Sequence, residues 1–112
     1  MDYYDNMINK KEYFEKAHGL TFEIKKMAPM EYLYECAVGF KTTVKYLLRD
    51  RKDMDKIRRL YTYARNGNQL PMPFIKYSKE GKFLGQEGIH RAIVALELGE
   101  ETIPVLVITV LN

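Results

Sequence analysis

Two stretches of the sequence have the hydrophobic pattern of buried β-strands. From Leu20 to Met27 apolar and polar residues alternate, which is the period of a strand with one buried face. From Ile103 to Val110 an unbroken apolar and β-branched run is typical of a central strand covered on both faces. A shorter pair of strands is expected at Phe74–Tyr77 and Lys82–Gly85, joined by a hairpin turn that ends in Gly81.

Helical spacing of apolar residues predicts four helices after the first strand. The strongest pattern is DMDKIRRLYTYARNG, in which Asp53 is a candidate N-cap and Gly67 a candidate C′ residue. Between them one apolar stripe is formed by Met54, Ile57, Leu60, Tyr61 and Ala64. The other three helices are expected at residues 29–39, 42–48 and 89–98.

The order strand, three helices, two strands, helix, strand indicates an α+β fold, a small mixed β-sheet with flanking helices. A chain of 112 residues buries one core, so we expect residues 20–112 to form a single domain. Residues 1–19 are expected to precede it as an N-terminal helical segment, with a short helix from Asn9 to Ala17.

Composition and targeting signals restrict the class of protein. Hydrophobic residues make up 46% of the chain, which favours a folded core over disorder. The longest apolar run, Ile103 to Leu111, is far shorter than the roughly 20 residues of a membrane-spanning helix. The opening residues lack the apolar region of a signal peptide, and Cys36 is a single cysteine. We therefore expect a cytoplasmic protein with no membrane partner, in which Cys36 is a buried thiol.

Basic residues are concentrated between Lys41 and Arg65, where nine Lys or Arg stand against three Asp, although the net charge of the chain is only +3. Such a segment can attract nucleic acid, and Tyr61 and Tyr63 within it can stack on bases. The alternative is a solvated helix face whose acids offset its bases, with tyrosines that pack. The residues predicted to contact nucleic acid are Lys52, Lys56, Arg58, Arg59 and Arg65.

The stretch GQEGIHR, between the last short strand and the last helix, has the composition of a phosphate-binding turn. Gly85 and Gly88 permit close backbone approach, and the helix N-terminus offers N–H groups to an anion. His90 and Arg91 add donors suited to phosphate. Glu87 is then the candidate catalytic base or metal ligand. The structural alternative is that Arg91 pairs with Glu87.

The motif Glu87-Gly88-Ile89-His90-Arg91, with Ala92, Ala95, Leu98-Gly99 and Ile103-Pro104-Val105 after it, resembles the core of the ParB/sulfiredoxin superfamily. Upstream, Met27-Ala28-Pro29-Met30-Glu31-Tyr32-Leu33 resembles the turn and helix of its short phage-type members. The resemblance implies a nucleotide pocket, often with Mg²⁺ and a nucleoside triphosphate. It implies that His90 and Arg91 contact phosphate, that Gly88 supplies backbone approach, and that Glu87 orients the turn or a metal. Ile89 occupies the position of the reactive cysteine of sulfiredoxin, so repair of sulfinic acid is not implied.

Three functions follow as hypotheses. The first is a stand-alone domain that binds a nucleotide at the turn, with hydrolysis or phosphoryl transfer as a further step. The second is a nucleic-acid-binding or nuclease-like module that uses the basic residues of 41–65. The third is a phage-type adaptor or inhibitor that binds a host protein and uses the fold as a scaffold.

Overall fold

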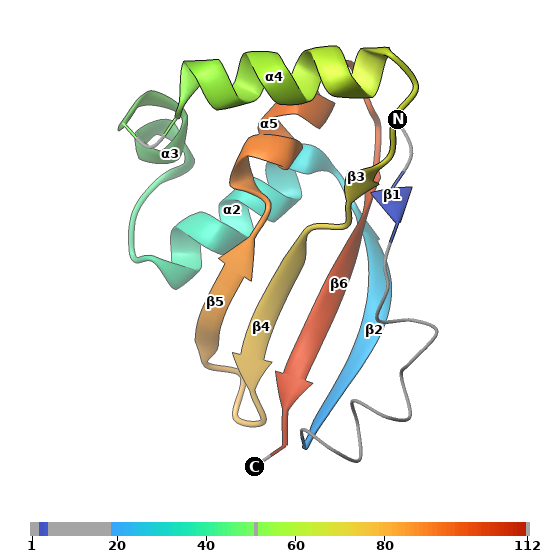
Figure 1. Cartoon of the computed structure of the whole chain (residues 1–112). Helices are drawn as coiled ribbons and strands as arrows, with labels where there is room; N and C mark the ends of the chain where they lie inside the picture. The colour runs from blue at the N-terminus through green and yellow to red at the C-terminus, as the bar shows by residue number, and fades with distance from the viewer. Residues whose placement is uncertain (1–2, 5–18, 51, 112) are drawn as a thin grey trace.

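The computed structural model describes residues 3–4, 19–50 and 52–111. Its centre is a four-stranded mixed sheet in the order β2 (Leu20–Met27), β6 (Ile103–Val110), β4 (Phe74–Ser78) and β5 (Phe83–Glu87) (Figure 1). The described helices are α2 (Pro29–Gly39), α3 (Val44–Asp50), α4 (Met54–Arg65) and α5 (Ile89–Glu97). The predicted α+β class with a small mixed sheet is confirmed.

The sheet combines two antiparallel pairs around one parallel contact. β2 pairs antiparallel with β6, β6 lies parallel to β4, and β4 forms an antiparallel hairpin with β5. The hairpin turn is the predicted one, because Gly81 has a φ of 86° and its N–H donates to the carbonyl of Ser78. β5 extends two residues beyond the predicted strand, which places Glu87 in the sheet opposite Phe74.

β6 is buried on both faces, as its apolar run predicted. Ile103 and Val105 belong to the main core, which is shared with the helices on one face of the sheet. Leu106 and Ile108 point to the other face, where they pack with Phe22 in a second apolar cluster. The central position of β6 in the sheet therefore follows from its sequence.

α2 lies against β5 at a point where only glycine fits. Pro29 occupies the first turn of α2, where its missing N–H costs nothing, and the helix ends at Gly39 as predicted. A Cβ added at Gly39 would lie 2.4 Å from the ring of Phe83. The chain turns after the end of α2, and in this turn Lys41 has a positive φ of 56°.

α4 has the predicted caps. The side chain of Asp53 accepts from the N–H of Lys56 at 3.1 Å, and Gly67 has a φ of 84° after the last turn. Ile57 and Ala64 are buried beneath the helix, whereas Met54, at the end of the predicted stripe, is exposed. Met54 lies in the first turn, at the edge of the contact between α4 and the core.

Three further expectations differ from the structure or lie outside its described part. α3 begins two residues later than predicted, because the side chain of Thr43 accepts from the N–H of Tyr46 and caps it. A short parallel ladder between β1 (Tyr3–Tyr4) and β3 (Leu70–Pro71) was not predicted, and it places a strand within the segment expected to be helical. The helix expected from Asn9 to Ala17 lies outside the described residues.

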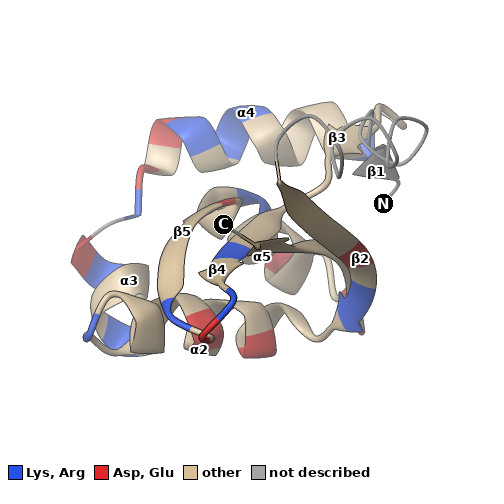
Figure 2. Ribbon diagram, turned by 90° about the horizontal axis from the view of Figure 1, so that it is seen from below, with Lys and Arg blue, Asp and Glu red and all other residues tan. Residues whose placement is uncertain are grey.

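Charge is distributed unevenly over the helices. α4 carries four basic residues and one acid, whereas α2 carries two acids and no basic residue. Figure 2 shows α4 and α2 on opposite sides of the molecule. The fold therefore separates a basic helix from an acidic one.

The buried hydroxyl of Tyr32 connects α2 to the ends of β4 and β5. It lies 3.2 Å from the carbonyl of Phe74 and 2.9 Å from Oε1 of Gln86, and burial raises its pKa far above the ordinary value. We predict that Tyr32→Phe lowers the free energy of unfolding by about 1–2 kcal/mol, because buried acceptors lose their donor. Urea denaturation of the variant measures this loss.

The matched control for this substitution is Tyr34→Phe, two residues further along the same helix, where the side chain is 60% exposed. It is expected to change stability by less than about 0.5 kcal/mol. Equal losses in the two variants would contradict the assigned role of the Tyr32 hydroxyl.

Candidate functional site

The predicted phosphate-binding turn is shorter than the sequence indicated. A single residue, Gly88, separates the end of β5 from the start of α5, and Gly85 lies within β5. Gly88 has a φ of 144°, and a Cβ there would lie 2.5 Å from Cβ of Pro73 and 3.0 Å from the hydroxyl of Tyr32. Packing against neighbouring protein atoms therefore requires glycine at 88. The position of Gly85 is open, with nothing within 4 Å of an added Cβ.

Arg91, the main predicted phosphate contact, points into the protein. Its side chain is only 9% exposed. Nη1 donates to the carbonyl of Pro71 at 2.5 Å, and Nη2 donates to Oε1 of Glu87 at 3.3 Å. The guanidinium thus joins α5 to β3 and β5, and this is the pairing that the structural alternative predicted.

Glu87, the candidate catalytic residue, is half exposed at the edge of the sheet, with 59% of its side chain accessible. Its Oε1 atom faces the Arg91 guanidinium, and a carboxylate oxygen beside a fixed cation is a poor ligand for Mg²⁺. Within the described part of the chain, no group of three His, Cys, Asp or Glu side chains is placed to hold a metal ion. The residues at the turn therefore do not fit a magnesium site.

His90 connects α5 to the start of α4. The N–H of Asp53 donates to Nε2 of His90 at 3.2 Å, which requires that nitrogen to be unprotonated. The pKa of Asp53 is lowered, first by the hydrogen bond from the N–H of Lys56, and also by the N–H of Asp55 and the charge of Arg59. His90 therefore helps to position the N-cap of α4.

The exposed face of α4 carries most of the predicted nucleic-acid contacts. Arg58 and Arg59 are exposed, whereas Lys52 and Lys56 are half-buried. Arg58 lies 3.7 Å from Asp55, with 74% and 86% of the two side chains exposed, so water screens this pair strongly. Arg65 is engaged within the helix, because its guanidinium lies 5.7 Å from the ring centre of Tyr61 and donates to its hydroxyl.

Three hollows line the flanks of α4. One, of about 390 Å³, is lined by Arg58, Arg59, Thr62, Tyr63 and Asn66. A second, of about 400 Å³, lies between α4 and β3 and is lined by Lys56, Arg59, Leu60, Tyr63, Leu70 and Pro71. A third, of about 300 Å³, faces Glu97 of α5. Arg58 borders the first and third of these hollows, and Arg59 borders the first and second.

Thr62 and Asn66 were not predicted as site residues. They follow Arg58 at spacings of four and eight, so the three side chains form one row on the helix surface. Arg59 and Tyr63 form the next row. Their spacing of four and eight residues from Arg58 was the signal in the sequence that could have identified them.

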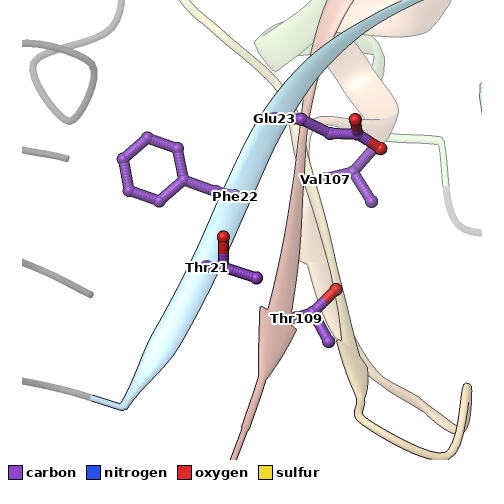
Figure 3. Close-up of a pocket in the computed structure, with 5 residues that line it drawn as sticks. All are labelled: Thr21, Phe22, Glu23, Val107 and Thr109. Atoms are coloured by element: carbon purple, nitrogen blue, oxygen red, sulfur yellow. The ribbon is translucent and has the colours of Figure 1, made fainter. Parts of the chain in front are cut away.

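A further hollow, of about 250 Å³, lies against β2 and β6. Figure 3 shows Thr21, Glu23, Val107 and Thr109 around it, with the ring of Phe22 turned away. It combines two hydroxyls with one carboxylate, and the described residues that line it include no basic side chain. This lining does not match the chemistry of a phosphate ligand.

The buried titratable groups between α2 and the sheet are held in their neutral forms. Burial raises the pKa of the Cys36 thiol to about 11, which keeps it from acting as a nucleophile. Tyr77 donates to Oε2 of Glu35 at 3.0 Å, and burial together with this contact raises its pKa to about 12. The prediction that Cys36 is a buried thiol is confirmed.

Comparison of the chain with known protein families, curated proteins and solved structures finds no match. The similarity to the ParB/sulfiredoxin superfamily therefore stays a prediction that rests on the motif residues. The longest described helix, α4, has 12 residues, and none of the described helices has the length and apolar character needed to cross a membrane.

The Arg91 contacts predict a structural phenotype. Arg91→Ala removes a charged donor from the Pro71 carbonyl, so we expect the free energy of unfolding to fall by about 2 kcal/mol or more. Glu87→Gln leaves that donor in place and removes only a half-exposed pairing, so its cost should stay below about 1 kcal/mol. Thermal or urea unfolding of both variants tests this, and full stability of Arg91→Ala would show that the guanidinium serves another purpose.

The two glycines of the turn provide a second test. Gly88→Ala is expected to cost at least about 2 kcal/mol, because a Cβ collides with Pro73 in a backbone conformation that disfavours side chains. Gly85→Ala should be neutral or slightly stabilising, since the added methyl group meets open space. If both substitutions have the same effect on unfolding, packing is not the reason for Gly88.

Proposed function

We propose that this protein binds nucleic acid through the exposed face of α4. The observation that carries the proposal is the accessibility of Arg58 and Arg59, which lie side by side on α4 and line the hollows on its flanks. Guanidinium groups donate to phosphate oxygens in bidentate fashion, and closely spaced cations attract a polyanion.

The surroundings of the two arginines support the proposal. Asp55 is the only acid within α4, and its contact with Arg58 is exposed and weak. The acids of α2 lie on the opposite side of the molecule, so they do little to reduce the positive potential at α4 (Figure 2). Lys56 adds a third positive charge at the hollow beside β3.

The turn contributes to this site by supporting it. His90 holds the N-cap of α4 through Asp53, and Arg91 holds the Pro71 carbonyl of β3. Pro71 lines one of the hollows on α4. The residues that the ParB/sulfiredoxin resemblance assigns to phosphate binding thus shape the base of the proposed surface.

A nucleotide at the turn itself is the second candidate. The observation in its favour is that the hollow containing Lys56 and Arg59 is bounded by Pro71, the residue that Arg91 contacts. A mononucleotide there would raise the melting temperature of the protein, since it binds only the folded state. If the rise persists when Arg58 is replaced and is lost when Lys56 is replaced, the hollow next to Pro71 is supported over the exposed face of α4.

The double variant Arg58→Gln/Arg59→Gln tests the first proposal. Two lost phosphate contacts should weaken binding of a labelled oligonucleotide about tenfold or more at low salt, and should reduce the slope of log K against log salt by about 1.5. Fluorescence anisotropy over a salt series measures both quantities.

Lys79→Gln/Lys82→Gln is the matched control, because both lysines are exposed on the β4–β5 turn and the net charge falls by the same amount. Its affinity should stay within about twofold of the wild type, since screening limits the reach of these distant charges. If both double variants lose affinity equally, net charge and not the position of the arginines determines binding. Absence of binding by the wild type would refute the proposal. Capture of one stoichiometric protein partner would then favour an adaptor.

A further inference from the structure

Tyr63 projects from α4 between two hollows. Its side chain is 50% exposed, and it borders both the hollow with Thr62 and Asn66 and the hollow with Leu70 and Pro71. Arg59, four residues earlier, borders the same two hollows. An aromatic ring that stands beside a cation, with open space on both sides, presents surface to a flat ligand.

The two hollows differ in chemistry. The one beside β3 has an apolar lining of Leu60, Leu70 and Pro71, with Lys56 and Arg59 as its cationic members. The other has the hydroxyl of Thr62 and the amide of Asn66 beside its two arginines. An apolar lining suits the face of a nucleobase, whereas hydroxyl and amide groups suit its polar edge.

Tyr61, the other tyrosine of α4, does not offer the same surface. It is half-buried against the main core, its ring lies 5.7 Å from the guanidinium carbon of Arg65, and its hydroxyl accepts from that side chain. The intramolecular contacts of Tyr61 therefore occupy the groups that a ligand would use. The two tyrosines are separated by one residue, which on a helix directs them to different sides.

We propose that Tyr63 stacks on an unpaired base, so that the ligand of α4 is single-stranded nucleic acid. This inference rests on the proposed function, because Arg58 and Arg59 must hold the adjacent phosphates. In a duplex the faces of internal bases are already covered by their neighbours, whereas a single strand can place a base on an aromatic ring. Ribose and deoxyribose strands share this chemistry.

The test compares Tyr63→Leu with the wild type on four probes: a single-stranded DNA, an RNA of the same sequence, the DNA duplex, and a fully abasic strand that keeps the sugar–phosphate backbone. Tyr63→Leu should lower affinity for the first two probes about tenfold. The duplex and abasic strands should bind more weakly than the single strands in the wild type and be unaffected by the substitution. Tyr63→Phe, which keeps the ring, should retain wild-type affinity.

Tryptophan fluorescence can report stacking directly, because the chain contains no tryptophan of its own. Tyr63→Trp introduces a single fluorophore at the proposed contact, and Tyr34→Trp places one at a similarly exposed position on α2. Single-stranded probes should quench the emission of the first variant and not of the second. The abasic strand should quench neither, because it has no base to stack.

The results distinguish base stacking by Tyr63 from phosphate binding by α4. Unchanged affinity of Tyr63→Leu, together with a loss in Arg58→Gln/Arg59→Gln, would overturn base stacking and leave phosphate binding by α4 in place. Equal losses on all four probes would likewise overturn stacking, because the abasic strand keeps only its phosphates. Absence of binding by the wild type would overturn both. A difference between the DNA and RNA arms would identify which sugar the site accepts.

Discussion

β5 passes into α5 through one residue, and the close packing of that residue determines the geometry around it. The backbone at Gly88 lies against Pro73 and beneath the hydroxyl of Tyr32, where a side chain has no room. This contact directs the first turn of α5 inward. As a result Arg91 reaches the carbonyl of Pro71, while His90, one residue earlier, reaches the backbone of Asp53. Two segments distant in the chain are therefore attached to the same helical turn.

The position of α4 follows from these attachments. Its N-cap is held by His90, and its buried stripe of Ile57 and Ala64 rests on the core. An amphipathic helix fixed in this way leaves its opposite face to water. The basic residues of that face are accessible because the turn and the core together occupy the inner side. The turn has the residues of a phosphate-binding motif, but its contacts position α4. The turn and the exposed cationic face of α4 therefore belong to one structural unit.

Much of the fold could be predicted because its signals are local. The alternation in β2 and the double-faced apolar run of β6 depend only on which residues must avoid water. The ends of α4 follow from Asp53 and Gly67, each of which satisfies backbone groups within its own turn. The boundaries of α3 and β5 were less accurate, since Thr43 caps one and pairing with β4 extends the other. The short β1–β3 ladder joins strands too brief to leave a pattern.

By itself the sequence determined the fold class, the central strand, the capped basic helix and the list of chemically capable residues, because each depends on composition or on neighbours within a few positions. Only the tertiary structure decided which way those residues point. Arg91 has the chemistry of a phosphate ligand, yet its guanidinium is directed to Pro71, and the need for glycine at 39 and 88 comes from Phe83 and Pro73 across the fold. Orientation is set by contacts between segments far apart in the chain, and no local pattern encodes it.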